Sequence, residues 1–369
     1  MSTRPRLLLG SVDVPHWGGA ASVHYALFDL MRRDGHAVHY VNLPLGGEAP
    51  MLQTRFGRGW ENPRDLPDVA TLILADPLWR LHENLAAHIA ALRPDLLVAR
   101  GYIAAWVMRR AAPELPLVFL VTGSHRLKQL LYDGLVDDYL DFERLARRGV
   151  EFPEPARDRE REAIEGSDLI VLHSPHVRRV YQHFVPGHLG TVYARDISDA
   201  DGVYAAAQPF AHLARPFAER DIDVLLVASD WRRPEKDYPL AARLARACPE
   251  LRFHLVGAVP DDDAPLVRHG LIGDAAALFA LYGRARAVVS PSRFDAAPGV
   301  LFEASAMGGN VVATPNCGNW QLCHEELVAP TAAQLPDRLR RAVTAPLPDR
   351  RARFLGGYAE LVEVLHDFA

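Results

Sequence analysis

The stretch PSRFDAAPGVLFEASAMGG, residues Pro291 to Gly309, places two carboxylates on either side of seven residues. It overlaps the end of RAVVSPS, an apolar run that predicts a buried strand. Pro298 and Gly299 disfavour a helix that runs through from Asp295, and a helical pattern resumes just after them. We therefore expect Asp295 in a strand-to-helix loop and Glu303 in the first turns of the helix, both directed at one cleft.

A plainer interpretation of this pair gives Asp295 a loop or capping role and Glu303 a solvated position on the helix. The predicted start of a helix between Asp295 and Glu303 argues against this interpretation. The backbone N–H groups of Gly299, Val300 and Leu301 are predicted to be free at this start, where they favour an anion. The spacing alone leaves both interpretations open.

The same alternation of strand and helix extends in both directions from this stretch. In the first half RLLLGSVDV, AVHYVNLPL, DLLVAR, LPLVFLVTGS and LIVLHS are predicted strands. In the second half IDVLLVAS, LRFHLVGAV, RAVVSPS and NVVATP follow the same pattern. The predicted fold class is α/β, with two doubly wound Rossmann-like domains that face each other across a cleft, where open sheets bind ligands.

The periodicity fades between Pro186 and Asp221 into sequence rich in Gly, Pro and Ala, which predicts a domain boundary. The chain of 369 residues also exceeds the size of a single hydrophobic core. We assign residues 1–205 to a first domain and residues 206–350 to a second. Residues 351–369 are predicted to be helical, and packing back on the first domain is one arrangement for them.

Composition excludes several classes of function. The net charge of -5 and the lack of a long Lys/Arg run argue against a nucleic-acid partner. No apolar run approaches the roughly 20 residues of a membrane span, so we expect a cytoplasmic protein. Cys248, Cys317 and Cys323 fit neither a disulfide framework nor a zinc site and are predicted to be reduced thiols.

Other site templates do not fit the sequence. Gly10, Gly18 and Gly19 do not match G-x-G-x-x-G, so a dinucleotide is not expected. Gly18 and Gly19 at a helix entry suit an anion or a plain tight turn. We predict no metal site: the histidines of HSPH are expected to meet solvent or a carbonyl, and the acidic run Asp261–Asp263 to form a solvated turn.

The longer stretch SPSRFDAAPGVLFEASAMGGNVVATPNCG resembles the donor-site signature of the retaining, nucleotide-sugar-dependent glycosyltransferases of family four, which have the GT-B fold. In that family a Glu, seven residues and a second Glu precede Ala, a small residue and a strand with the sequence PVVAT. Asp295 takes the place of the first Glu, Glu303 and Ala304 match, and NVVAT follows. Some members also carry Pro three places after the first acid, as Pro298 is here.

Further segments resemble the family in the same order along most of the chain. GGAASVHYALFDLMRRDGHAVHYV is similar to the Gly-rich first loop and helix, and GSDLIVLHSPHVRR to a strand that ends in Ser. VLLVASDWRRPEKDYPLAARL is similar to the first strand of the second domain with its diphosphate-binding basic pair. The resemblance implies acceptor contacts in the first domain and donor contacts in the second.

The activity that the resemblance implies is sugar transfer with retention, from a UDP- or GDP-linked sugar to a small acceptor, without a metal or another cofactor. Lys236, one of only two lysines, and Arg232 or Arg233 would stabilise the departing diphosphate. Gly18 and Gly19 would add N–H donors from the first domain.

The remaining donor contacts that the resemblance implies lie in the opening stretch. Glu303 would accept hydrogen bonds from the ribose hydroxyls, and Asp295 would contact the donor sugar. The backbone along Pro298, Gly299, Val300 and Leu301 would hold sugar or phosphate oxygens. The leaving phosphate itself would take the acceptor proton, so no dedicated general base is required.

Departures from the family pattern leave individual roles open. Trp231 stands where the family usually has Arg, and Arg232 and Arg233 are the nearest candidates. The usual catalytic His aligns with Thr122, and His125 lies three places later as the candidate for that role.

The acceptor and two other functions also stay open. The segment from Arg126 to Phe152 lies where the family places acceptor contacts, and either a small cationic or polyhydroxylated ligand or a solvated helix suits it. A nucleotide-sugar epimerase of the same fold is one alternative function. A degenerate, non-catalytic relative is the other.

Overall fold

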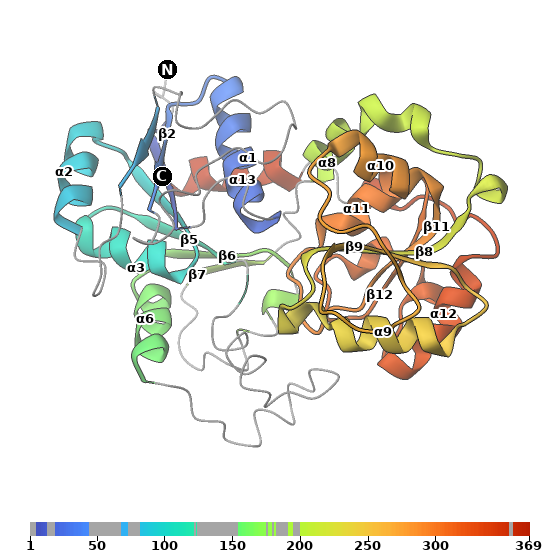
Figure 1. Ribbon diagram of the computed structural model, residues 1–369. Helices are drawn as coiled ribbons and strands as arrows, with labels where there is room; N and C mark the ends of the chain where they lie inside the picture. The colour runs from blue at the N-terminus through green and yellow to red at the C-terminus, as the bar shows by residue number, and fades with distance from the viewer. Residues whose placement is uncertain are drawn as a thin grey trace.

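The computed structural model describes residues 5–12, 19–43, 68–72, 82–121, 123, 154–174, 176–178, 181, 191–194, 200–353 and 357–369. These residues form two sheets, each with helices on both faces (Figure 1). Every pair of neighbouring strands in the two sheets is parallel. Because parallel strands need long crossover connections, helices cover both faces of each sheet.

The sheet of the first domain has seven strands in the order β3-β2-β1-β4-β5-β6-β7. Their bounds are Leu7–Ser11 (β1), Val38–Asn42 (β2), Val69–Thr71 (β3), Leu96–Arg100 (β4), Leu117–Val121 (β5), Leu169–Leu172 (β6) and Thr191–Ala194 (β7). β1, β4, β5 and β6 are buried along their whole length, as expected of strands that are covered on both faces.

Four helices of the first domain are described: α1 (Gly19–Arg33), α2 (His82–Leu92), α3 (Tyr102–Ala111) and α6 (Glu154–Glu165). Side chains of α2, α3 and α6 share one apolar core with one face of the sheet, and side chains of α1 share another core with the opposite face. The alternation along β1 shows this division, since Leu8 belongs to the first core and Leu7 and Leu9 to the second.

The sheet of the second domain has five strands in the order β10-β9-β8-β11-β12. Their bounds are Ile222–Asp230 (β8), Phe253–Ala258 (β9), Val267–Arg268 (β10), Ala285–Ser290 (β11) and Asn310–Ala313 (β12). One face carries α8 (Ala200–Ala207), α10 (Ala275–Arg284) and α11 (Gly299–Ala306), and the other carries α9 (Tyr238–Ala247) and α12 (Leu335–Ala342).

The last helix, α13 (Gly357–Phe368), packs on the first domain and lies beside α1 in Figure 1. Leu361, Val362 and Leu365 are buried in the same core as α1 and β1. The ring of His366 also lies against that of His36, with 2.8 Å between Nε2 and Nδ1. The carboxyl-terminal helix is therefore part of the first domain's packing.

The predicted fold class is confirmed, and the predicted strands of both halves are present. Six described α-helices and strands had no prediction: β3, β7, β10, α2, α8 and α12. The first two are only three and four residues long, too short to show a period. The core of the second domain takes in α8 from Ala200 onward, so the predicted division at residue 205 falls inside a helix.

None of the helices in the described part of the chain is both long enough and apolar enough to cross a membrane.

We predict that Leu365→Ala destabilises the first domain although Leu365 lies only four residues before Ala369. Leu365 is 0 % exposed, so its truncation should lower the free energy of unfolding by about 2–5 kcal/mol. Chemical denaturation measures this loss, with the exposed Glu363→Ala as the matched control. Equal stability of the two variants would contradict the packing of α13.

Candidate functional site

The candidate site forms at the carboxyl ends of the neighbouring strands β8 and β11. The loop after β8 contains a short 3-10 turn, Pro234–Lys236, and the loop after β11 contains Asp295. Since β8 and β11 are parallel neighbours, both loops emerge at one edge of the sheet. Two motifs that are 59 residues apart in the sequence therefore meet.

An ion pair joins these two loops. Lys236 Nζ lies 2.5 Å from Asp295 Oδ2, and the side chains are only 21 % and 16 % exposed. The backbone of Asp295 is also fixed, because its N–H donates to the Asn316 carbonyl at 3.0 Å and its carbonyl accepts from the Gly318 N–H at 2.8 Å. The structure thus brings together the two residues that the sequence assigned to the diphosphate and to the donor sugar.

Glu303 lies in the second turn of α11 and is 6 % exposed. Its Oε2 accepts a hydrogen bond of 2.6 Å from the hydroxyl of Tyr282, a fully buried residue of α10. The phenol holds the carboxylate in one orientation at the base of the site. The solvated helix position considered for Glu303 is therefore wrong.

The start of α11 differs from the prediction in one respect. Leu301 N–H donates to the Pro298 carbonyl at 3.1 Å, so this amide is not free. The same carbonyl accepts from Asn319 Nδ2 at 3.0 Å, which fixes the residue before the helix. Gly299 and Val300, the first two residues of α11, have no acceptor within the helix. The predicted anion site of three amides is thus reduced to two.

Trp231, which stands where the family usually has Arg, and the two arginines after it have different surroundings. Trp231 is 3 % exposed, and its Nε1 donates to the Val256 carbonyl at 2.8 Å, which makes it a core residue. Arg232 lies on the surface and pairs with Asp230 at 2.8 Å. Arg233 pairs instead with the carboxylate of Glu235, whose side chain is 4 % exposed.

A pocket of about 610 Å³ opens beside this loop on the α9 side of the domain. Its lining contains five arginines: Arg232, Arg233, Arg243, Arg246 and Arg293. Neither Lys236 nor Asp295 is among the described residues that line it. Arg232 and Arg233 therefore line this pocket, whereas Lys236 pairs with Asp295 and does not line it.

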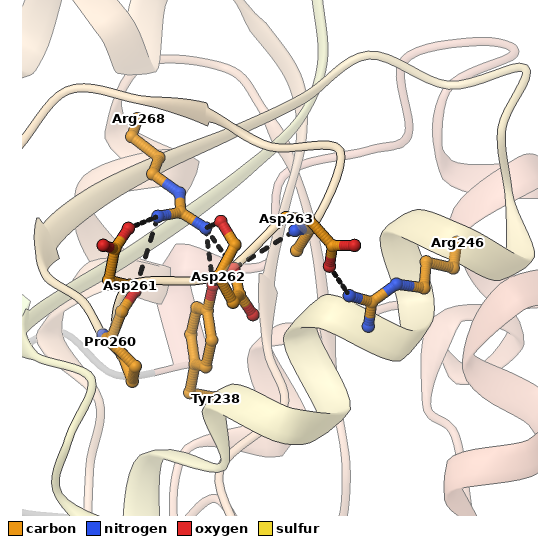
Figure 2. Close-up of polar contacts among 8 residues, drawn as sticks. Tyr238, Arg246, Pro260, Asp261, Asp262, Asp263 and Arg268 are labelled. Atoms are coloured by element: carbon orange, nitrogen blue, oxygen red, sulfur yellow. Dashed lines mark hydrogen bonds and ion pairs between the residues drawn. The ribbon is translucent and has the colours of Figure 1, made fainter.

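The acidic run after β9 is held by side chains around that pocket (Figure 2). Asp262 accepts from the Tyr238 hydroxyl at 2.7 Å and pairs with Arg268, and Asp263 pairs with Arg246 at 2.8 Å. The hydrogen bond to Asp262 and burial raise the pKa of Tyr238 to about 12, with burial the larger cause. No three His, Cys, Asp or Glu side chains among the described residues form a set of metal ligands.

Contacts of Phe294 and of the Ala296 carbonyl join the Asp295 loop to the first domain, and none of them was predicted. The Ser174 hydroxyl donates to the Ala296 carbonyl at 3.2 Å. The ring of Phe294 lies 5.3 Å from that of His176, between centroids. The sequence feature that could have indicated these contacts is Phe294, an aromatic residue directly before Asp295 in a loop.

The first-domain part of the predicted site lies mostly outside the described residues. Gly19 begins α1, as expected of a glycine at a helix entry. Gly18, Thr122 and His125 lie outside the described residues, as does the segment Arg126–Phe152. Their predicted roles therefore stay predictions.

The three cysteines are buried, free thiols, as expected. Burial raises the pKa of the Cys317 thiol to about 12. Cys317 forms an isolated bridge with Asp295, so it packs behind the site as a small apolar residue.

Residues 224–345 match the family model described as Glycosyl transferases group 1. This range contains Lys236, Asp295 and Glu303. The matched range lies within the second domain, which is therefore similar to this family. No curated protein matches the chain by sequence.

Solved structures with a similar fold come from glycosyltransferases. Sucrose-phosphate synthase from Thermosynechococcus elongatus is 19 % identical, with a TM-score of 0.62 over 98 % of this chain and 95 % of that chain. A UDP-forming trehalose-phosphate synthase from Burkholderia xenovorans is 15 % identical, with a TM-score of 0.61 over 98 % and 97 %. Anabaena HepE in complex with UDP is 15 % identical, with a TM-score of 0.57 over 98 % and 94 %. These similarities show that the fold is GT-B.

We predict that the second domain tolerates Arg232→Ala but loses stability on Arg233→Ala. Removing Arg233 leaves the buried Glu235 carboxylate without its cation, which should cost about 3 kcal/mol. The Arg232–Asp230 pair is exposed to solvent, so its loss should have little effect on stability. Denaturant unfolding compares the two variants, and a larger loss for Arg232→Ala would reverse the assignment.

We also predict that acid destabilises the fold partly through His173. Burial and the nearby Arg100 lower the pKa of His173 from 6.5 to about 3, so the folded state holds it neutral. The unfolded chain binds this proton below pH 6.5, and stability is therefore lost as the pH falls from there toward 3. The melting temperature of His173→Gln should fall less between pH 7 and 4.5 than that of the wild type. The exposed His212→Gln is the control, and it should follow the wild type.

Proposed function

We propose that the protein transfers a sugar from a nucleoside-diphosphate sugar to a small acceptor, with retention at the anomeric carbon. The observation that carries this proposal is the Lys236–Asp295 pair, which lies at the carboxyl edge of the domain that is similar to group 1 glycosyltransferases. A donor whose diphosphate meets Lys236 would place its sugar beside Asp295. UDP is the nucleotide to test first, because the similar structures include a protein in complex with UDP and a UDP-forming synthase.

Lys236 supplies the positive charge for the departing diphosphate in this proposal. Negative charge grows on the leaving oxygen as the glycosidic bond to the phosphate breaks, and a fixed ammonium group stabilises it. The amides of Gly299 and Val300 at the start of α11 add N–H donors and the positive end of the helix dipole. The chemistry then proceeds without a metal ion.

The two carboxylates bind the donor in different ways. Glu303, oriented by Tyr282, accepts from the ribose hydroxyls. Asp295 accepts from hydroxyls of the donor sugar and keeps Lys236 in place. Because Asp is one methylene shorter than the family's Glu, its carboxylate lies closer to the backbone, which is held by Asn316 and Gly318.

Retention needs the acceptor to attack from the face that the diphosphate leaves. The leaving phosphate oxygen then takes the proton of the acceptor hydroxyl on that same face. No general base from the protein is required for this step. His125 stays a candidate for a contact to the donor sugar.

We predict that Lys236→Ala lowers kcat about a hundredfold or more, the scale for losing one charge-stabilising donor. The donor is found first by thermal shift with a panel of UDP- and GDP-linked sugars. Steady-state kinetics then compares Lys236→Ala with Lys236→Arg, which keeps a cation and should retain part of the activity.

Near-normal turnover of Lys236→Ala, with donor binding unchanged, would contradict the proposal. Turnover of the donor to an epimeric nucleotide sugar without any acceptor would instead favour the epimerase alternative. Absence of a thermal shift with every nucleotide would favour a non-catalytic relative.

A further inference from the structure

Phe294 belongs to the second domain by sequence and to the first domain by packing. It follows β11 in the loop that carries Asp295, yet it is 3 % exposed and lies in the apolar core of the first domain. The same core contains Leu172, Val177 and Tyr181 of the first domain. A loop of the donor domain thus places its one aromatic side chain inside the neighbouring domain.

The ring of Phe294 packs against Gly123, two residues after β5, and against His176, four residues after β6. An added Cβ at Gly123 would lie 3.0 Å from Phe294 Cε1, so the glycine leaves the space that the ring needs. The ring of His176 lies 5.3 Å from that of Phe294 at an angle of 38°. The ring of Phe294 is therefore in close contact with both residues.

Hydrogen bonds inside the first domain hold the Gly123 side of this contact. The Tyr181 hydroxyl lies 3.2 Å from the Gly123 carbonyl and 3.0 Å from Glu160 Oε1. Both Tyr181 and Glu160 are 0 % exposed. Gly123 is thereby linked through Tyr181 to Glu160 of α6.

A second contact fixes the same loop one residue after Asp295. The Ala296 carbonyl accepts from the Ser174 hydroxyl at 3.2 Å. Gly318 allows this approach, since an added Cβ there would lie 1.5 Å from the Ala296 oxygen and 2.5 Å from Ser174 Oγ. Asp295 is thus held between two residues, Phe294 and Ala296, that both contact the first domain.

We infer that Phe294 is a positioning residue, which makes the placement of Asp295 depend on the contact between the two domains. This inference rests on the proposed function for its effect on catalysis. The first domain contacts Phe294 and Ala296, the residues on either side of Asp295, and so supports the backbone from which the carboxylate reaches Lys236. Loss of the Phe294 contact should therefore impair sugar transfer, whereas the nucleotide contacts proposed for Glu303 and the α11 amides lie within the second domain.

The kinetic test compares Phe294→Leu with Phe253→Leu, a second buried Phe that lies in the core of the second domain. Phe294→Leu should lower kcat about tenfold, because misplacing a reacting group by a fraction of an ångström has effects of this size. Its Kd for UDP should stay within twofold of the wild type. Phe253→Leu should lower the melting temperature and leave kcat unchanged. Normal kcat for Phe294→Leu, or an equal loss for both variants, would overturn the inference.

A double-mutant cycle tests whether Phe294 and Tyr181 act on Asp295 through the same contact. Tyr181→Phe removes the hydroxyl that holds Gly123 and should also lower kcat without weakening UDP binding. If both changes act through one contact, the double variant should lose less than the product of the two single losses. Fully multiplicative losses would show that Tyr181 acts independently of Phe294.

Hydrogen exchange separates this inference from the proposed function, because it needs no donor. The Asp295 and Gly318 amides should exchange faster in Phe294→Leu and in Tyr181→Phe than in the wild type. Faster exchange in a protein without transferase activity would support the positioning role and refute the proposed function. Unchanged exchange in both variants would overturn the positioning role itself.

Discussion

Parallel pairing of the strands is the constraint on which the rest of the molecule depends. Parallel neighbours cannot be joined by a tight turn, so the chain crosses each sheet as a helix and buries both faces. The carboxyl edge of each sheet is then the place where loops can present polar groups. Lys236 and Asp295 meet there because β8 and β11 are neighbours in space, not because their motifs are close in sequence.

Three consecutive charged residues hold the loop after β8 in place through ion pairs. Glu235 pairs with Arg233, Lys236 with Asp295, and Asp237 with Arg293 at 3.0 Å. Asp237 also caps α9, where its Oδ1 accepts from the Leu240 amide at 3.1 Å. Each of these charges is mostly buried, so removing its partner leaves an uncompensated charge in a poorly solvated place. Such a turn holds its ammonium group in one position, which is what stabilisation of a leaving group requires.

The strand pattern made the fold predictable, because continuous apolar strands and amphipathic helices follow local periods. The family signature located Asp295, Glu303 and Lys236, and Pro298 with Gly299 separated the two acids correctly. The contacts around these residues could not be predicted, since Tyr282 reaches Glu303, and His176 reaches Phe294, only through the packing of distant elements. A sequence motif shows where a charged residue lies along the chain. It does not show which residue of opposite charge will lie beside it in the folded protein.

The return of α13 to the first domain means that the chain passes between the two domains twice. A single tether would let the domains swing and twist about each other, whereas two tethers allow a hinge and resist rotation about the line between them. The tail also changes what a label on the chain reports. A fluorophore attached after Ala369 reports the position of the amino-terminal domain, because α13 packs in the core of that domain. Energy transfer to a second fluorophore on the exposed Leu271 therefore measures the distance between the two domains.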